Sequence, residues 1–338
     1  MTRADKPLAL TLGDPAGIGP DITLLAFEER FRAPIPPFVL LGDPDVLGER
    51  ARALGLGVKI KTIGDASAAL PVFDIALPVL PIAVAASVVA GHPDPANAAI
   101  VQQSIERSVT LVQSEAASAV VTNPISKAIL AQAGFGFPGH TEFLAALAGR
   151  EASDAVMMLV GDGLRVVPVT IHLPLKDVIG ALSTERILKT LEITARDVAR
   201  YFGLARPRIA VTGLNPHAGE DGTMGSEEIE TIMPAIEAAR RQGLDVSGPY
   251  PADTLFHAEA RKNYDVAVAM YHDQALIPVK TLAFDTGVNV TLGLPFVRTS
   301  PDHGTAFTLA GTGRASPRSL IEALRLADTM QRNADAAP

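Results

Sequence analysis

LALTLGDPAGIGPD, residues 8–21, joins a short apolar run to a glycine-rich turn and the beginning of a helix. The run 8–12 has the length and composition of a buried strand. The three glycines of GDPAGIG predict a tight turn, and Pro20 suits the first turn of a helix, where its missing N–H costs nothing. A strand, a tight turn and a helix in this order are typical of a βαβ unit. We therefore expect an α/β protein.

The same alternation continues along the chain. Further apolar runs typical of strands occur at 37–42 and 118–122 and as VVPVTI, IAVTGL and VAVAM. Helices are expected at 96–116, 184–202, 226–242 and 317–332. Strands alternating with helices predict a mainly parallel sheet.

The composition narrows the class of protein. The chain has 338 residues, of which 48% are hydrophobic and 20% charged, so it can bury a large core as two domains or one large α/β unit. Its net charge is −8 and no run of lysine or arginine stands out, which argues against nucleic-acid binding. It has no cysteine, which excludes disulfides, thiolate nucleophiles and cysteine-ligated metals.

No segment of the sequence is typical of a membrane span or a signal peptide. The most apolar stretch, 75–90, falls short of the roughly 20 residues that a spanning helix needs, and Pro78 and Pro81 interrupt it. We interpret it as extended, buried chain and expect a cytoplasmic protein without membrane contact.

Three histidines follow apolar runs directly, namely His172 in VTIHLPL, His217 in GLNPHAGEDG and His272 in AMYHDQALIP. In open α/β sheets, ligands bind beyond the carboxyl ends of the strands. Three imidazoles with an open fourth position form a catalytic zinc site. A single histidine at a strand end is more often a buried structural residue, whereas the common placement of all three favours ligation. Both interpretations therefore stay open at this point.

Familiar nucleotide-binding and nucleophile motifs do not identify a site in this chain. A literal GxGxxG occurs at Gly134, Gly136 and Gly139, but it follows a helical pattern rather than a strand, and Pro138 interrupts it. Neither a Walker A motif nor a GxSxG elbow is present. The glycine-rich turn at 13–21 has the better context, either as a tight connection or as a close backbone approach to a ligand at a helix N-terminus.

Several polar residues lie where an anion could bind. VVTNPISK (120–127) and PGHTEFL (138–144) end a strand and begin a helix, and the second contains His140 and Thr141. Thr141 as a helix cap with His140 on the surface is the alternative. Lys280, Asn289 and Arg298 lie among apolar residues, where they pair either with an anionic ligand or with acids such as Asp285 and Asp302.

Taken in order, these motifs resemble one family. GDPAGIGPD, TNPISK, GHTEFLA, HLPLKDV, GLNPHAGEDGTMGSEE, GPYPADTLF, YHDQALIPVK and GVNVTLGLPFVRTSPDHGTA are similar to the 4-hydroxythreonine-4-phosphate dehydrogenases of pyridoxal phosphate biosynthesis. The resemblance covers about residues 7–330. It implies an isocitrate/isopropylmalate dehydrogenase-like fold with two interwoven α/β domains and a cleft between them. The implied domains are 1–125 with 300–338 on the NAD side, and 126–299 on the metal, substrate and dimer side.

The resemblance also implies a reaction. It predicts the NAD-dependent, divalent-metal-dependent oxidation of 4-phosphooxy-L-threonine, a phosphorylated small molecule, to 2-amino-3-oxo-4-phosphooxybutanoate, which decarboxylates to 3-amino-2-oxopropyl phosphate. Zinc is the expected ion, with magnesium or cobalt as alternatives, because imidazole ligands accept several metals. The family forms homodimers whose active sites lie at the subunit interface.

The same resemblance assigns roles to individual residues. It implies that the metal ligands are His172, His217 and His272. The implied substrate contacts are His140, Thr141, Lys280, Asn289 and Arg298. His303, Gly304 and Thr305 would lie at the NAD, and Asp253 and His140 are candidates for proton transfer.

Three alternatives remain open at the level of sequence. The first is a paralogous dehydrogenase acting on 4-phosphorylated threonate or erythronate or on an aromatic dihydrodiol dicarboxylate. The second is a three-histidine metallohydrolase, which would need no dinucleotide site. The third is a non-catalytic metal- or phosphate-sensing module.

Overall fold

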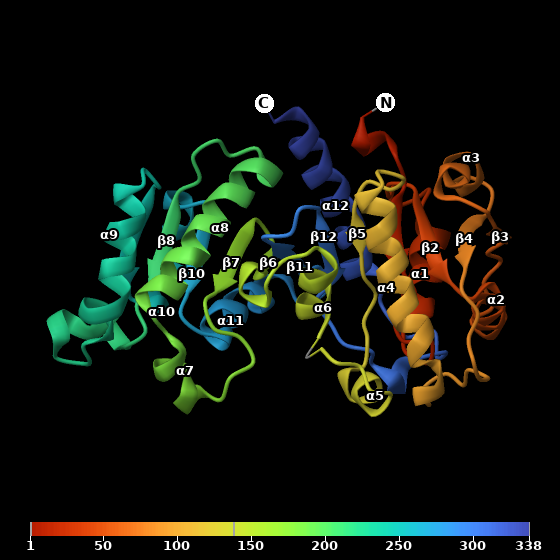
Figure 1. Cartoon of the computed structure of the whole chain (residues 1–338), viewed down its shortest axis with the longest axis horizontal. Coiled ribbons are helices and arrows are strands. Elements are labelled where there is room, and N and C mark those ends of the chain that lie inside the picture. Colours follow the sequence, from red (N-terminus) through yellow and green to blue (C-terminus); the bar gives the residue numbers. More distant parts are fainter. Residues whose placement is uncertain (1, 138, 338) are drawn as a thin grey trace. The chain divides into compact units, whose positions relative to one another are not determined.

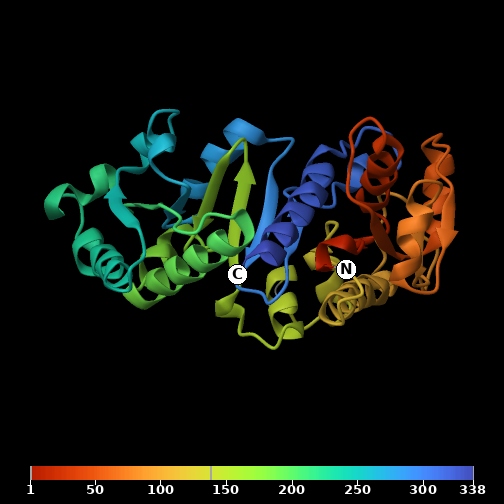
Figure 2. The same cartoon turned by 90° about the horizontal axis from the view of Figure 1, so that it is seen from above.

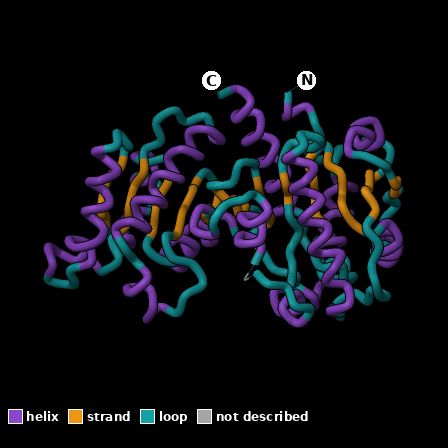
Figure 3. The backbone as a smooth tube through the Cα atoms, in the orientation of Figure 1, coloured by secondary structure: helices purple, strands orange, loops and turns teal. Residues whose placement is uncertain are grey.

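The computed structural model describes residues 2–137 and 139–337, and Pro138 within the rejected GxGxxG stretch lies outside the described residues. The chain divides into two compact units (Figure 1). Unit 1 comprises the chain up to Ala155 together with Leu294–Ala336, and unit 2 comprises Val156–Gly293. Each unit contains strands that lie between helices (Figure 3).

The strands of unit 1 form a parallel sheet in the order β3-β4-β2-β1-β5-β12. Their bounds are β1 Leu8–Thr11, β2 Phe38–Gly42, β3 Ile60–Thr62, β4 Leu77–Pro81, β5 Val120–Val121 and β12 Arg298–Pro301. The helices are α1 Gly19–Glu29, α2 Pro44–Ala53, α3 Ala69–Phe73, α4 Ala98–Gln113, α5 Lys127–Gln132, α6 His140–Leu147 and α12 Arg318–Ala336.

Helices cover both faces of this sheet. Helices α1 and α12 pack together on one face, and α4 packs against β1 and β2 on the other (Figure 2). Strands β1 and β2 are buried throughout, as their continuous apolar runs require. The βαβ arrangement predicted from residues 8–21 is therefore confirmed.

Unit 2 has a mixed sheet in the order β11-β6-β7-β10-β8-β9. The strands are β6 Val156–Gly161, β7 Leu164–Pro168, β8 Ile209–Thr212, β9 Val246–Tyr250, β10 Val266–Ala269 and β11 Val288–Leu292. The helices are α7 Leu175–Ala181, α8 Thr184–Phe202, the π-helical segment Glu228–Ile232, α9 Met233–Arg241, α10 Ala252–Leu255 and α11 His272–Ala283. β7, β10, β8 and β9 are parallel, whereas β6 is antiparallel to both β7 and β11.

Most of the expected elements are confirmed, and two expectations need correction. In the stretch 75–90 only residues 76–80 and Ile82 are buried, because the chain leaves the sheet after β4 and residues from Ala83 onward are partly or fully exposed. Residues 126–155 and 294–299, expected in the second domain, group with unit 1 instead. Residues 126–155 group with unit 1 because they include α6, which packs against α4.

None of the helices in the described parts of the chain is both long and apolar enough to cross a membrane.

Candidate active site

The three histidines follow three neighbouring strands of unit 2. β7, β10 and β8 lie side by side and run parallel. Their carboxyl ends therefore lie along one edge of the sheet, which is the edge where α/β proteins bind ligands. His172 follows β7, His272 follows β10, and His217 follows β8.

His172 and His272 are brought together by backbone pairing that continues past the strands. The Val169 N–H donates to the Ala269 carbonyl, and the Thr170 N–H and Oγ1 both bond the Met270 carbonyl, at 3.2 and 2.7 Å. Each histidine lies two residues beyond this last paired position. As a result, the two imidazole ring centroids are 5.8 Å apart.

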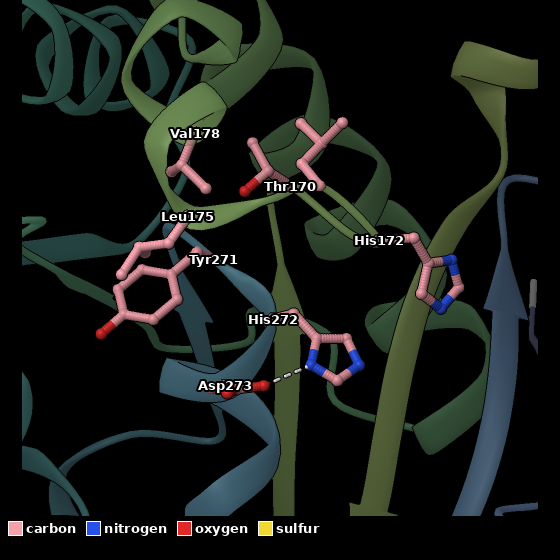
Figure 4. A pocket seen from close by; sticks show the side chains of 8 residues that line it. Thr170, His172, Leu175, Val178, Tyr271, His272 and Asp273 are labelled. Carbon is pink, nitrogen blue, oxygen red and sulfur yellow. Dashed lines mark hydrogen bonds and ion pairs between the residues drawn. The ribbon is translucent and has the colours of Figure 1, made fainter.

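This separation fits two imidazoles on one metal ion. With metal–nitrogen bonds of about 2.0–2.1 Å in a tetrahedral site, the two ring centroids would lie roughly 5 Å apart, so the rings are close to ligating positions. The Nδ1 atom of His272 is 2.7 Å from Asp273 Oδ1. A carboxylate on Nδ1 leaves Nε2 for a metal and orients the ring, as outer-shell carboxylates commonly do. Figure 4 shows both rings and the Asp273 contact.

A cavity of about 260 Å³ adjoins the two rings. The lining residues are Thr170, His172, Leu173, Leu175, Val178, Tyr271, His272 and Asp273. His172 has a backbone φ of +53°, in the left-handed region that only a few non-glycine residues adopt, often at functional sites.

His217 does not join this pair within one chain. Among residues 2–137 and 139–337, no group of three or more histidine or acidic side chains is arranged to hold a metal. The register of β8 on β10 places Gly213 beside Met270, so His217 lies two residues farther from its strand than His272 does. The single chain therefore assembles two of the three expected ligands.

In unit 1, His140 and Thr141 begin helix α6. The alternative in which Thr141 caps this helix is wrong, because Gly139 occupies the cap position. His140 is partly buried, and its Nε2 has no hydrogen-bond partner among the described residues. A buried polar atom without a partner is costly unless a ligand satisfies it.

Two cations surround His140. Burial, and then the nearby charges of Arg298 and Lys127, hold the pKa of His140 well below its usual value. Arg298 is 3% exposed and donates from Nη2 to Thr122 Oγ1 at 2.6 Å. Its burial lowers the pKa of Arg298 to about 10, so it remains a cation at neutral pH. A neutral imidazole beside two positive side chains is suited to an anionic ligand.

The other expected substrate residues lie in unit 2. Lys280 is on α11, with its ammonium 5.9 Å from the Phe284 ring centroid. Asn289 is the second residue of β11 and is partly buried. Asp253 is exposed in the first turn of α10.

The segment expected at NAD packs against the glycine-rich turn of unit 1. The Ile18 N–H donates to the Thr305 carbonyl at 3.0 Å, and a Cβ on Gly17 would lie 3.1 Å from that oxygen. The Thr305 carbonyl therefore holds the glycine-rich turn in place. His303 and Gly304 are exposed, and a Cβ on Gly304 would meet nothing within 4 Å, so a ligand has room there.

Three residues shape these sites in ways that the sequence did not predict. Asp273 orients His272, and its position directly after that histidine was the available signal. Lys127 was noted only as a possible anion contact, and its effect on His140 depends on tertiary structure. Gln274 bonds Thr212, Gly213 and Met270, which ties the end of β8 to the end of β10. Nothing in the sequence distinguishes it from an ordinary helical glutamine.

Comparison with known proteins identifies the family of this chain. Residues 34–327 match the family model described as "Pyridoxal phosphate biosynthetic protein PdxA". The chain belongs to the PdxA family. The resemblance found in the sequence is therefore confirmed.

Individual PdxA relatives extend the comparison. A 4-hydroxythreonine-4-phosphate dehydrogenase of Xanthobacter autotrophicus is 56% identical over 327 residues, covering 96% of this chain and 93% of the relative. The crystal structure of 4-hydroxythreonine-4-phosphate dehydrogenase from Klebsiella pneumoniae is 36% identical, with a TM-score of 0.87 over 96% of this chain and 99% of that one. The expected α/β fold is thus confirmed.

A more distant solved structure is also similar to this chain. A terephthalate 1,2-cis-dihydrodiol dehydrogenase from Burkholderia xenovorans is 29% identical, with a TM-score of 0.64 over 96% of this chain and 98% of that one.

Proposed function

We propose that this chain is an NAD-dependent 4-hydroxythreonine-4-phosphate dehydrogenase of pyridoxal phosphate biosynthesis. The substrate is 4-phosphooxy-L-threonine. Hydride leaves its C3 for NAD⁺, the hydroxyl proton leaves, and the resulting 2-amino-3-oxo acid loses CO₂. The observation that carries the proposal is the His172–His272 pair at the carboxyl edge of the unit 2 sheet, in a chain of the PdxA family.

The two histidines are suited to a divalent ion. Imidazole nitrogens bind Zn²⁺ or Co²⁺, with Mg²⁺ a less typical partner. When bound, such an ion acts as a Lewis acid that favours loss of the hydroxyl proton and stabilises negative charge during decarboxylation. The residues of the chain hold and orient it, His272 with the help of Asp273.

We propose His217 of a second copy of the chain as the third ligand. Within one chain His217 stands apart from the other two, and its loop is held by several hydrogen bonds to Glu228. A site built from two copies satisfies both observations. It also requires the homodimer that the resemblance to the family implies.

Exposed apolar side chains near the histidine pair favour such a second copy. Leu175 and Ile179 on α7 are 68% and 55% exposed, and Ile277 on α11 is 62% exposed. Large apolar side chains that are this exposed on neighbouring elements are typical of a protein interface.

The anionic groups of the substrate would bind the cationic residues. We assign His140, Thr141 and Arg298 to one anionic group, because the neutral His140 ring and the uncapped first turn of α6 both offer hydrogen bonds. Lys280 and Asn289 would bind the remaining polar groups. His303, Gly304 and Thr305 would border NAD, with Gly304 leaving room for the cofactor.

Asp253 is our candidate for the proton-transfer residue. Because its carboxylate is exposed, it can exchange protons with solvent. His140 is the second candidate, since its low pKa keeps the imidazole neutral and able to accept a proton.

Steady-state NADH formation tests the proposal. The purified chain, loaded with Zn²⁺ or Co²⁺, is assayed with 4-phosphooxy-L-threonine, with a 4-phosphorylated threonate and with a dihydrodiol dicarboxylate. We expect turnover of the first substrate, dependence on the metal, and loss of activity after chelation. Turnover of the threonate alone would assign a paralogous activity. The absence of NAD⁺ binding by calorimetry would instead favour a metallohydrolase or a sensing module.

A further inference from the structure

The loop that carries His217 has an unusual backbone. Five consecutive residues, His217 to Asp221, have φ values of 53°, 52°, 78°, 42° and 53°. These lie in the left-handed region, which L-residues other than glycine avoid. A run of this kind persists only where its surroundings hold it in place.

Glu228 holds the start of this loop, together with Glu227, whose Oε2 accepts a hydrogen bond from Asn215 Nδ2 at 2.7 Å. The Glu228 side chain is 4% exposed, and Glu228 begins the π-helical segment Glu228–Ile232. Oε1 accepts hydrogen bonds from the backbone N–H groups of Leu214 and Asn215, both at 2.8 Å, and Oε2 accepts one from Asn215 Nδ2 at 2.9 Å. A buried carboxylate needs such donors, and hydrogen bonds to a charged acceptor are the stronger kind.

The loop backbone also folds closely around this carboxylate. A Cβ on Gly213 would lie 2.9 Å from Oε1, and a Cβ on Gly219 would lie 2.6 Å from Oε2. Gly219 is the middle residue of the left-handed run. The glycines therefore let both ends of the loop approach one buried charge, and the histidine stands between them.

We propose that Glu228 is a positioning residue that sets His217 for metal ligation. This inference rests on the proposed function, because it takes His217 to be a ligand. Glu228 itself touches neither metal nor substrate. It fixes the two amides that follow β8, and thereby the start of the turn that presents the imidazole.

Glu228→Gln separates the charge from the shape of the side chain. The glutamine Oε1 can still accept from the two backbone amides, but its NH₂ group would face the NH₂ group of Asn215, donor against donor. Glu230→Gln is the matched control, because Glu230 is an exposed acid on the same helical segment.

Two measurements test the proposal. One is Co²⁺ affinity by chelator competition, together with the visible absorption of bound Co²⁺, which reports ligand geometry. The other is amide hydrogen exchange of Leu214 and Asn215 in the metal-free protein. For Glu228→Gln we expect about a 10–100-fold loss of affinity and an altered Co²⁺ spectrum. We also expect exchange of these two amides to be faster by roughly tenfold or more, because the acceptor oxygen loses its charge and the contact of the two NH₂ groups displaces the side chain. Glu230→Gln should match the wild type in all three respects.

Unchanged Co²⁺ affinity and spectrum in Glu228→Gln would overturn the inference, even if exchange or thermal stability changed. Weaker Co²⁺ binding with unchanged exchange at these amides would also overturn it. His217→Ala separates this failure from that of the proposed function. If His217→Ala binds Co²⁺ as the wild type does, His217 is not a ligand and the proposed function itself fails at this point. If His217→Ala loses affinity while Glu228→Gln does not, only the inference is wrong.

Discussion

His140 and His272 have the same side chain but opposite surroundings. His140 is partly buried beside the cations Arg298 and Lys127, and its pKa is held well below the usual value. His272 is 37% exposed at the edge of a sheet and carries a carboxylate partner, Asp273, at 2.7 Å. The first environment favours a neutral ring that bonds an anionic ligand. The second favours a ring whose free nitrogen binds a cation.

The largest expected effect is the loss of a metal ligand. His272→Ala should lower kcat by on the order of 10³-fold, because the Lewis acid is lost or misplaced. The measurement is NADH formation at saturating substrate, with bound zinc determined on the same sample. His257→Ala is the control, since His257 is an exposed histidine of the same unit. Full activity in His272→Ala would remove the metal role from this residue.

The next largest effect tests the surroundings of His272 alone. Asp273→Asn keeps the size of the side chain but removes the carboxylate charge that lies beside His272 Nδ1. We expect about a 10–100-fold loss of zinc affinity, with part of the activity restored by excess metal. An unchanged zinc affinity would show that Asp273 does not orient the ring.

A third substitution tests the anion-binding role of the His140 environment. Arg298→Lys keeps the positive charge but loses the planar guanidinium. We expect KM for the phosphorylated substrate to rise by roughly tenfold or more, with a smaller change in kcat and no change in zinc content. A fall in zinc content with an unchanged KM would contradict the division of roles between the two histidines.

The smallest effect concerns pH and stability. Because the folded-state pKa of His140 lies below its unfolded value, the unfolded chain binds this proton first as the pH falls below about 6.5. This group therefore destabilises the fold progressively between that pH and its lower folded-state pKa. His140→Gln should lose less stability than the wild type over this window, measured as Tm against pH. An equal pH dependence would show that His140 titrates normally.

The sequence predicted the strands of this fold better than their pairing. The apolar runs predicted β1, β7, β8 and β10. The three histidines follow the last three of these strands. The antiparallel pair β6–β7 was missed, although a signal was present. Asp162 and Gly163, with φ of 48° and 74°, form the Asp-Gly connection typical of a tight hairpin.

The site could be predicted only where a functional side chain lies a fixed number of residues past the end of a strand. His172 and His272 each lie two residues past a shared paired position, so their approach follows from β-sheet register. His217 does not follow this rule, because it lies four residues past Gly213, which the register of β8 places beside Met270. The role of Glu228, the influence of Lys127 on His140 and the grouping of residues 126–155 with unit 1 all depend on tertiary contacts, which local patterns do not encode.

Subunit complementation tests the central claim most directly. His217→Ala and His272→Ala are each expected to be inactive, and the two are unfolded together and refolded as a mixture. If each site combines His172 and His272 of one copy with His217 of the other, random pairing makes about a quarter of the sites complete, and that share of wild-type, metal-dependent NADH formation should return. If no activity returns from a mixture shown to contain mixed dimers, the three histidines do not meet across two copies of this chain.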